Sequence, residues 1–152
     1  MRVVIQCAVV LAICGVFVPS AWTQTSTNVE RELFASVNQT RGTQGLPVLK
    51  WDEGLATAAR RHAAQMAKHG AAQHVFAGEP NLPSRATQAG CRFYSLSENV
   101  VQGTTAEAIH SEFLRSPNHR ANLLDTDIDS IGVGVAERGG QLFVVEDFSK
   151  AK

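Results

Sequence analysis

Five histidines offer the most reactive side chains in this sequence, and three of them have ordinary structural explanations. His62 falls on the apolar face of a predicted helix, which favours a buried histidine hydrogen-bonded to backbone. His69 falls in the last turn of that helix, where a cation complements the helix dipole. His110 lies near Glu107 in a charged segment that is predicted to be solvated.

His74 and His119 are the histidines whose positions favour chemistry. His74 lies in a long loop, and His119 lies in the first turn of a helix that Ser116 is predicted to cap through its hydroxyl group. The positive end of a helix disfavours an imidazolium, so His119 is expected to stay neutral. A neutral imidazole can bind a metal or accept a proton, but these positions alone still favour a capping or packing role for both histidines.

Motifs that would assign an enzyme class are absent from the sequence. It contains no Gly-x-Ser-x-Gly elbow, no His-Glu-x-x-His helix and no Gly-x-x-x-x-Gly-Lys loop. A hydrolase, a zinc protease of that type or a nucleotide-binding protein therefore has no direct sequence support.

Composition indicates one neutral, globular domain. The chain has 152 residues, 44% hydrophobic, with fourteen basic and fourteen acidic residues. Its apolar fraction is too high for a disordered chain. The balanced charge argues against nucleic acid as a partner, because binding phosphates needs a basic face.

The N-terminus has the pattern of a secretory signal peptide, assigned to residues 1–23. Arg2 precedes the apolar run 3–18 and the small residues that follow Pro19. An uncleaved anchor is the alternative, but the run is shorter than the roughly 20 residues that span a bilayer. The rest of the chain, 24–152, is expected to be extracellular or periplasmic, without stable membrane insertion.

Removal of this leader would leave Cys91 as the one cysteine of the exported domain. A single cysteine cannot form an internal disulfide. We expect Cys91 to be a small buried hydrophobe rather than a reactive thiol.

Helix-start signals divide the first two thirds of the chain. A capping box at 27–30 predicts a helix that ends near Gly42, and Asp52 is expected to cap a second helix that stops at Gly70. Residues 71–103 are predicted to be mostly irregular. A further capping box at 104–107 opens a third helix, and a short helix is expected to follow Ser116.

The last third changes to strand periodicity. Residues 130–136 and 142–148 flank the turn Arg138-Gly139-Gly140 and predict an antiparallel hairpin. Gly132 and Gly134 would let a helix approach one face closely, and both faces need covering. The predicted fold class is therefore α+β, an α-β-α sandwich with a small antiparallel sheet between helices.

Five short motifs follow one another along the chain after the leader. They are Asn38-x-x-Arg41-x-x-x-Gly45-Leu46-Pro47-x-Leu49-x-Trp51-Asp52, Leu55-x-x-x-Ala59-x-x-His62-Ala63-x-x-Met66, Ser97-Glu98-Asn99-Val100, Ser116-Pro117-x-His119-Arg120-x-Asn122-Leu123-Leu124 and Ile131-Gly132-Val133-Gly134-Val135. Their order resembles the CAP superfamily (cysteine-rich secretory, antigen 5 and pathogenesis-related-1 proteins, or SCP-like domains) in its bacterial, disulfide-free form. The resemblance covers nearly all of 24–152.

The resemblance implies a cleft lined by two histidines and two glutamates, which binds a divalent metal in some members. By position, His74 and His119 would be the histidines and Glu98 the first glutamate. The second glutamate would fall at Ser116, a departure from the pattern, and Glu112 one turn earlier is a conjectural substitute. Two imidazoles and one carboxylate form the ligand set of an open zinc site.

The resemblance leaves two functions open. The first is a secreted binding module whose cleft holds a divalent metal such as zinc, a small lipid or another envelope ligand. The alternative is a metal-assisted, peptidase-like hydrolase in which the His/Glu/His cleft positions a water. Its weakness is the missing general base, because Glu98 cannot readily be both ligand and base.

Overall fold

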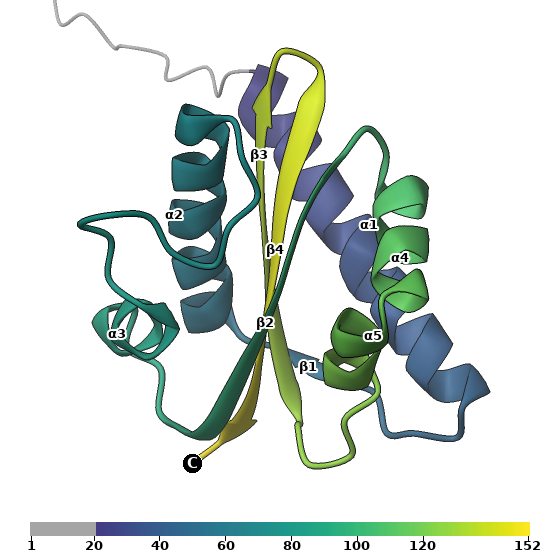
Figure 1. Ribbon diagram of the computed structural model, residues 1–152. Coiled ribbons are helices and arrows are strands. Elements are labelled where there is room, and N and C mark those ends of the chain that lie inside the picture. The colour runs from purple at the N-terminus through teal and green to yellow at the C-terminus, as the bar shows by residue number, and fades with distance from the viewer. Residues whose placement is uncertain (1–20) are drawn as a thin grey trace, which may run out of the picture.

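The protein is a three-layer α-β-α sandwich, as predicted (Figure 1). A computed structural model describes residues 21–152. The predicted signal peptide therefore lies outside the described residues except for its last three. Along the described residues, no helix combines the length and apolar character that crossing a membrane requires.

The sheet has four strands in the order β1-β3-β4-β2. Strands β3 (Ser130–Arg138) and β4 (Gln141–Ala151) form the predicted antiparallel hairpin. Strand β2 (Phe93–Gly103) pairs antiparallel with β4 and forms one edge. The two-residue β1 (Lys50–Trp51) pairs parallel with β3, so the sheet is mixed rather than wholly antiparallel.

One face of the sheet is covered by α2 (Glu53–His69), with α3 (Leu82–Gln88) beside it (Figure 1). The side chain of Asp52 caps α2 by accepting from Leu55 N–H at 2.9 Å, and Gly70 ends it in the left-handed conformation. A Cβ atom at Gly134 would lie 2.2 Å from the backbone of α2. This close approach confirms why the hairpin needs glycines on this face.

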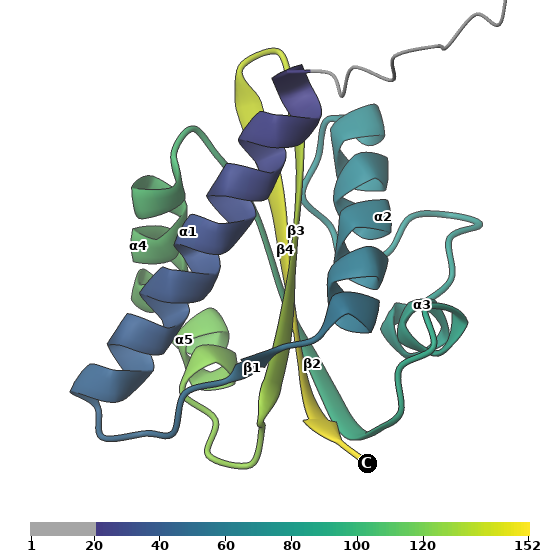
Figure 2. The same ribbon diagram turned by 180° about the vertical axis from the view of Figure 1, so that it is seen from behind.

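The other face is covered by α1 (Ala21–Thr43), α4 (Ala106–Arg115) and α5 (Pro117–Leu123) (Figure 2). Ile131 and Val133 of β3 are fully buried against this layer, together with Phe113 of α4. The alternation of large and very small residues along β3 therefore matches its two different helical layers.

Two residues of the first motif fix the end of α1 to the rest of the molecule. Asn38 donates to the carbonyl of Leu49 at 3.1 Å and accepts from its N–H at 2.7 Å, which holds the connector to β1. The fully buried Arg41 donates to the carbonyl of Leu123 at 2.9 Å. Through Arg41, the C-terminal end of α5 is tied to α1.

Two local predictions were wrong. Helix α1 begins at Ala21 and runs through the predicted cap at Thr27. Glu30 closes no capping box, because it is buried and binds the Arg60 guanidinium at 2.8 Å. The segment 71–103 is not mostly irregular either, since it contains α3 and the eleven residues of β2.

Candidate functional site

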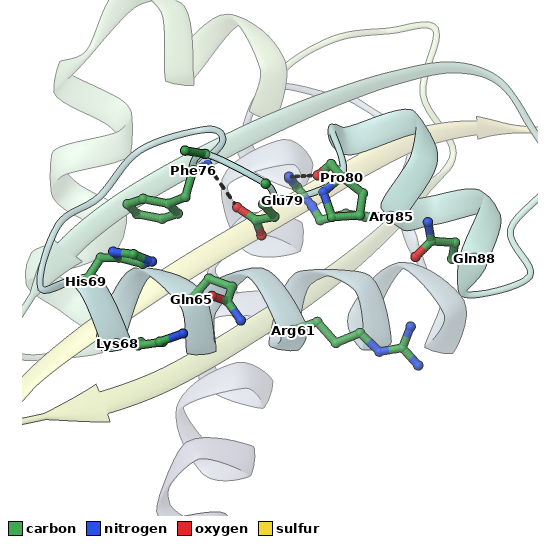
Figure 3. A pocket seen from close by; sticks show the side chains of 11 residues that line it. Arg61, Gln65, Lys68, His69, Phe76, Glu79, Pro80, Arg85 and Gln88 are labelled. Atoms are coloured by element: carbon green, nitrogen blue, oxygen red, sulfur yellow. Dashed lines mark hydrogen bonds between the residues drawn. The ribbon is translucent and has the colours of Figure 1, made fainter.

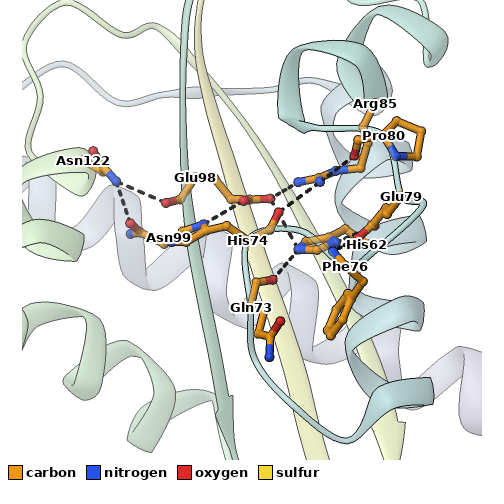
Figure 4. Close-up of polar contacts among 10 residues, drawn as sticks. All are labelled: His62, Gln73, His74, Phe76, Glu79, Pro80, Arg85, Glu98, Asn99 and Asn122. Atoms are coloured by element: carbon orange, nitrogen blue, oxygen red, sulfur yellow. Dashed lines mark hydrogen bonds and ion pairs between the residues drawn. The ribbon is translucent and has the colours of Figure 1, made fainter.

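The candidate site is built around the edge strand β2, where two neighbouring residues face opposite layers of the sandwich (Figure 4). Glu98 contacts side chains from the α2 and α3 side, whereas Asn99 contacts α5. Successive side chains of a strand point to opposite faces. A single edge strand therefore connects both helical layers at this place.

His74 and Glu98 are brought into direct contact, as the family pattern implies. His74 Nδ1 lies 2.9 Å from Glu98 Oε1. The side chain of His74 is 62% exposed, while that of Glu98 is 4% exposed. The carboxylate is thus buried under an imidazole that faces solvent.

The second oxygen of Glu98 binds Arg85, a residue that sequence analysis did not select. Arg85 Nη2 donates to Glu98 Oε2, and Nη1 donates to the carbonyls of His74 at 3.2 Å and Pro80 at 3.1 Å. Arg85 therefore compensates the buried charge of Glu98 and also fixes the backbone of the loop that carries His74.

Asp147 is the cross-strand partner of Glu98 on β4. Burial and the neighbouring charge of Glu98 raise the pKa of Asp147 well above its usual value, while Arg85 acts in the opposite direction. A protonated Asp147 removes the repulsion that two buried carboxylates at this position would suffer.

A second histidine–glutamate pair lies beside the first. His62 is completely buried, with Nδ1 2.7 Å from Glu79 Oε1 and Nε2 2.8 Å from the carbonyl oxygen of Gln73. The prediction of a buried His62 bonded to backbone is confirmed, and its bond to Glu79 adds an anchor for the loop after α2.

His119 lies in the first turn of α5, on the other side of β2. Asn99 donates from Nδ2 to the His119 carbonyl at 3.1 Å, and Asn122 donates to Asn99 Oδ1 at 2.9 Å. Burial lowers the pKa of His119, and the charge of His74 lowers it further, while Glu112 raises it. The imidazole is therefore expected to be neutral.

Asn99 has another partner, Glu146 of β4. Asn99 Nδ2 lies 3.3 Å from Glu146 Oε2, and the carboxyl group is completely buried. Burial raises the pKa of Glu146 to about 8. A neutral, protonated Glu146 thus takes part in the polar network that positions α5.

The two secondary candidates differ from their predicted roles. Ser116 is the N-cap residue of α5 by position, but its side chain makes no capping hydrogen bond. That result corrects the prediction that its hydroxyl group is committed to backbone N–H groups. Glu112 is paired with Arg115 on the exposed side of α4, at 2.5 Å.

The prediction that His110 is solvated was wrong. Its Nε2 lies 2.8 Å from Thr40 Oγ1, and burial between α1 and α4 lowers its pKa. Cys91 is half-buried, and burial together with Asp52 and Asp147 raises the pKa of its thiol to about 11. The thiol is therefore protonated at neutral pH, which agrees with an unreactive Cys91.

The structure brings His74 and Glu98 into contact and places His119 across β2 from them. Within residues 21–152, as their side chains stand, no group of three His, Cys, Asp or Glu residues is arranged to hold a metal ion. Each oxygen of Glu98 already has a protein partner. Of the three residues that the family pattern names, the two histidines are therefore the ones with ring nitrogens to offer. Sequence analysis missed Arg85 and Glu146, because their role depends on contacts between distant segments.

Comparison with known families identifies the chain. The model of the CAP, or cysteine-rich secretory protein, family matches residues 34–148. The chain belongs to this family, as its motifs predicted.

Individual relatives agree with this assignment. The chain is 29% identical over 115 residues to the uncharacterized membrane protein YlbC of Bacillus subtilis, covering 75% of this chain and 33% of that protein. It is 28% identical over 111 residues to the uncharacterized protein YkwD of the same species, covering 72% and 43%. The crystal structure of an extracellular SCP-domain protein from Bacillus anthracis superposes with a TM-score of 0.81 at 26% identity, covering 90% of this chain and 45% of that one. The chain thus spans less than half the length of these relatives.

Proposed function

We propose that this protein is an exported binding module whose cleft takes a divalent metal ion, with His74 and His119 as the protein ligands. Membership of the CAP family supports a cleft at this place in the fold. The basic start and apolar run support export, and the similar Bacillus anthracis protein is described as extracellular. An extracellular or periplasmic location is part of the proposal.

The contact between His74 and Glu98 carries this proposal. Nδ1 of His74 faces a buried carboxylate at 2.9 Å, so the exposed ring offers Nε2 outward. Histidines that bind metals commonly donate their other ring N–H to a carboxylate, which fixes the tautomer and the ring orientation. Glu98 would then act by orienting His74, and Arg85 would hold Glu98 in place.

His119 fits the second ligand position. Burial and His74 lower its pKa, which favours the neutral ring that metals bind. Its Nδ1 is buried without a hydrogen-bond partner among the described residues, so no protein donor competes for the lone pair of that nitrogen. Two imidazoles and water suit zinc, which would polarise an oxygen ligand in its open positions.

The contacts of the acidic groups support binding over hydrolysis. Glu98 bonds His74 through one oxygen and Arg85 through the other, and Glu112 is paired with Arg115. A general base needs a carboxylate that is free to accept a proton from water. Glu98 offers none in this arrangement, because both of its oxygens are bonded and its side chain is 4% exposed.

Calorimetric titration with Zn²⁺ tests the proposal. We expect His74→Ala and His119→Ala each to weaken binding at least about tenfold, and Glu98→Gln to weaken it by about tenfold through loss of orientation. His69→Ala is the matched control, because His69 is an exposed histidine at the other end of the loop. Equal zinc affinity in the wild type, His74→Ala and His119→Ala would refute the site.

A further inference from the structure

A pocket lies between α2, the loop that follows it and α3 (Figure 3). Its volume is about 440 Å³, within the range of small-molecule sites. Helix α2 forms one wall with Arg61, Gln65 and Lys68, which recur at helical spacing. The loop 76–80 and α3 form the opposite wall.

The wall of α2 carries positive charge that no protein acid neutralises. Arg61 and Lys68 are exposed, and neither forms an ion pair with any residue in the described part of the chain. Glu79 is the one acid that lines the pocket, and it is already bonded to His62 at 2.7 Å and to Phe76 N–H at 3.1 Å. An anion entering the pocket would therefore meet two cations whose charges are still available.

Arg85 of α3 contributes a buried cation to the wall of the pocket. It lines the pocket although it is only 5% exposed. Its Nη atoms bond Glu98 and two backbone carbonyls, but its Nε–H is buried and has no partner among residues 21–152. Because this atom is inaccessible to solvent, Arg85 shapes the wall of the pocket rather than offering Nε to a ligand.

An aromatic surface adjoins these cations. The rings of His69 and Phe76, which both line the pocket, stack with their centroids 4.3 Å apart and their planes 12° apart. Flat rings of this kind suit the apolar face of a sugar, and the amides of Gln65 and Gln88 can bond hydroxyl groups. The lining thus combines cations that can bind an oxyanion with aromatic rings and amides that can contact a sugar ring.

We propose that this pocket binds a sugar-sized molecule carrying a phosphate or carboxylate group, with Arg61 and Lys68 binding the oxyanion and Phe76 contacting the ring. The shared chemistry is an oxyanion on a polyhydroxylated ring. The proposal can be tested apart from the zinc site, because Arg61 and Lys68 make no contact with His74, Glu98 or His119, although Arg85 adjoins both sites.

Calorimetric titration with glucose 6-phosphate, glucuronate, inorganic phosphate and glucose tests this proposal on the purified protein. We expect saturable binding of one or both sugar anions, weakened by salt, and no binding of glucose. Tighter binding of glucose 6-phosphate would identify phosphate as the oxyanion, and tighter binding of glucuronate would identify carboxylate. No saturable binding of either sugar anion, or inorganic phosphate binding as tightly as both, would overturn the proposal.

Charge variants locate the binding. Arg61→Gln and Lys68→Gln are expected to weaken binding about fivefold each, because each removes one charge-assisted contact at the surface. Arg120→Gln removes one exposed charge from α5, on the opposite side of the sheet, and should leave the affinity unchanged. Equal weakening in all three variants would refute this pocket as the site. Thermal unfolding of each variant checks that the fold is intact.

Discussion

Two histidine–glutamate pairs lie side by side beneath the loop after α2 (Figure 4). They differ in how many ring nitrogens of the histidine have a hydrogen-bond partner in the protein. In the first pair, His62 is fully buried, and both of its ring nitrogens have protein partners, at 2.7 and 2.8 Å. In the second, His74 is 62% exposed and bonds Glu98 through one nitrogen, at 2.9 Å. Residue types and contact distances are nearly the same.

The comparison shows what separates a structural histidine from a candidate ligand. His62 has no lone pair or N–H left to offer, because Glu79 and the carbonyl of Gln73 use both nitrogens. His74 keeps Nε2 for an outside partner while Glu98 fixes its ring. Removing His62 should therefore damage the fold, and removing His74 should damage binding.

The largest expected effect is the loss of stability in His62→Ala. The substitution leaves the Glu79 carboxylate with one fewer partner in a buried position and opens a cavity, so we expect the free energy of unfolding to fall by about 3 kcal/mol. His74→Ala should lower it by less than about 1 kcal/mol, since His74 is exposed and Arg85 still pairs with the Glu98 carboxylate. Urea unfolding followed by circular dichroism measures both, and equal losses would break the distinction between the two pairs.

A third buried glutamate sharpens the comparison, because Glu146 has no basic partner. Burial raises its pKa from 4.5 to about 8. Between these pH values the folded protein holds a proton that the unfolded chain releases, so Glu146 makes stability fall as pH rises from about 4.5 to about 8. Glutamine keeps the acceptor for Asn99 but cannot ionise.

Glu146→Gln should therefore be more stable than the wild type at pH 9, by up to a few kcal/mol, and should differ little at pH 5. Urea unfolding at the two pH values measures this difference. Asp129→Asn is a control, since Asp129 is a carboxylate that pairs with Lys150 at the surface and whose pKa is lowered. A constant difference between Glu146→Gln and the wild type at both pH values would contradict a protonated Glu146.

Sequence reasoning succeeded where the role of a residue depends on its neighbours in the chain or on a recognisable spacing of residue types. Asp52 and Gly70 lie at the two ends of α2, as expected, because helix caps depend on neighbouring residues. The spacing of Gly132 and Gly134 correctly indicated close approach by a helix. The family motifs named both His74 and Glu98, and the structure places these two side chains 2.9 Å apart.

It failed where distant contacts override local signals. The capping box at Thr27 has the right residues, but Glu30 is drawn into an ion pair with Arg60 and into contact with β3. Strand β2 was missed because it carries Glu98 and Asn99 in its middle, and their polarity hides the strand pattern. Arg85 could have been suspected only by asking which cation compensates a buried Glu98.

The smallest expected effect tests whether His74 and His119 share one cleft. Burial lowers the pKa of His119 below its usual 6.5, and the positive form of His74 lowers it further. In His74→Ala the electrostatic part disappears while burial remains, so the pKa of His119 should rise and stay below 6.5. A histidine ring titration by NMR measures it, with His69→Ala as the control that should leave His119 unchanged.

The same shift sets the direction of the pH dependence of zinc binding. A neutral ring is the form that binds, so zinc affinity should fall as pH drops through the pKa of His119 and of the other ligand. Because the folded protein binds this proton more weakly than the unfolded chain, His119 also makes stability fall as pH decreases from 6.5 toward its lowered pKa. If the titration of His119 were identical with and without the imidazole of His74, the two rings would not interact, and the cleft that the zinc proposal needs would not exist.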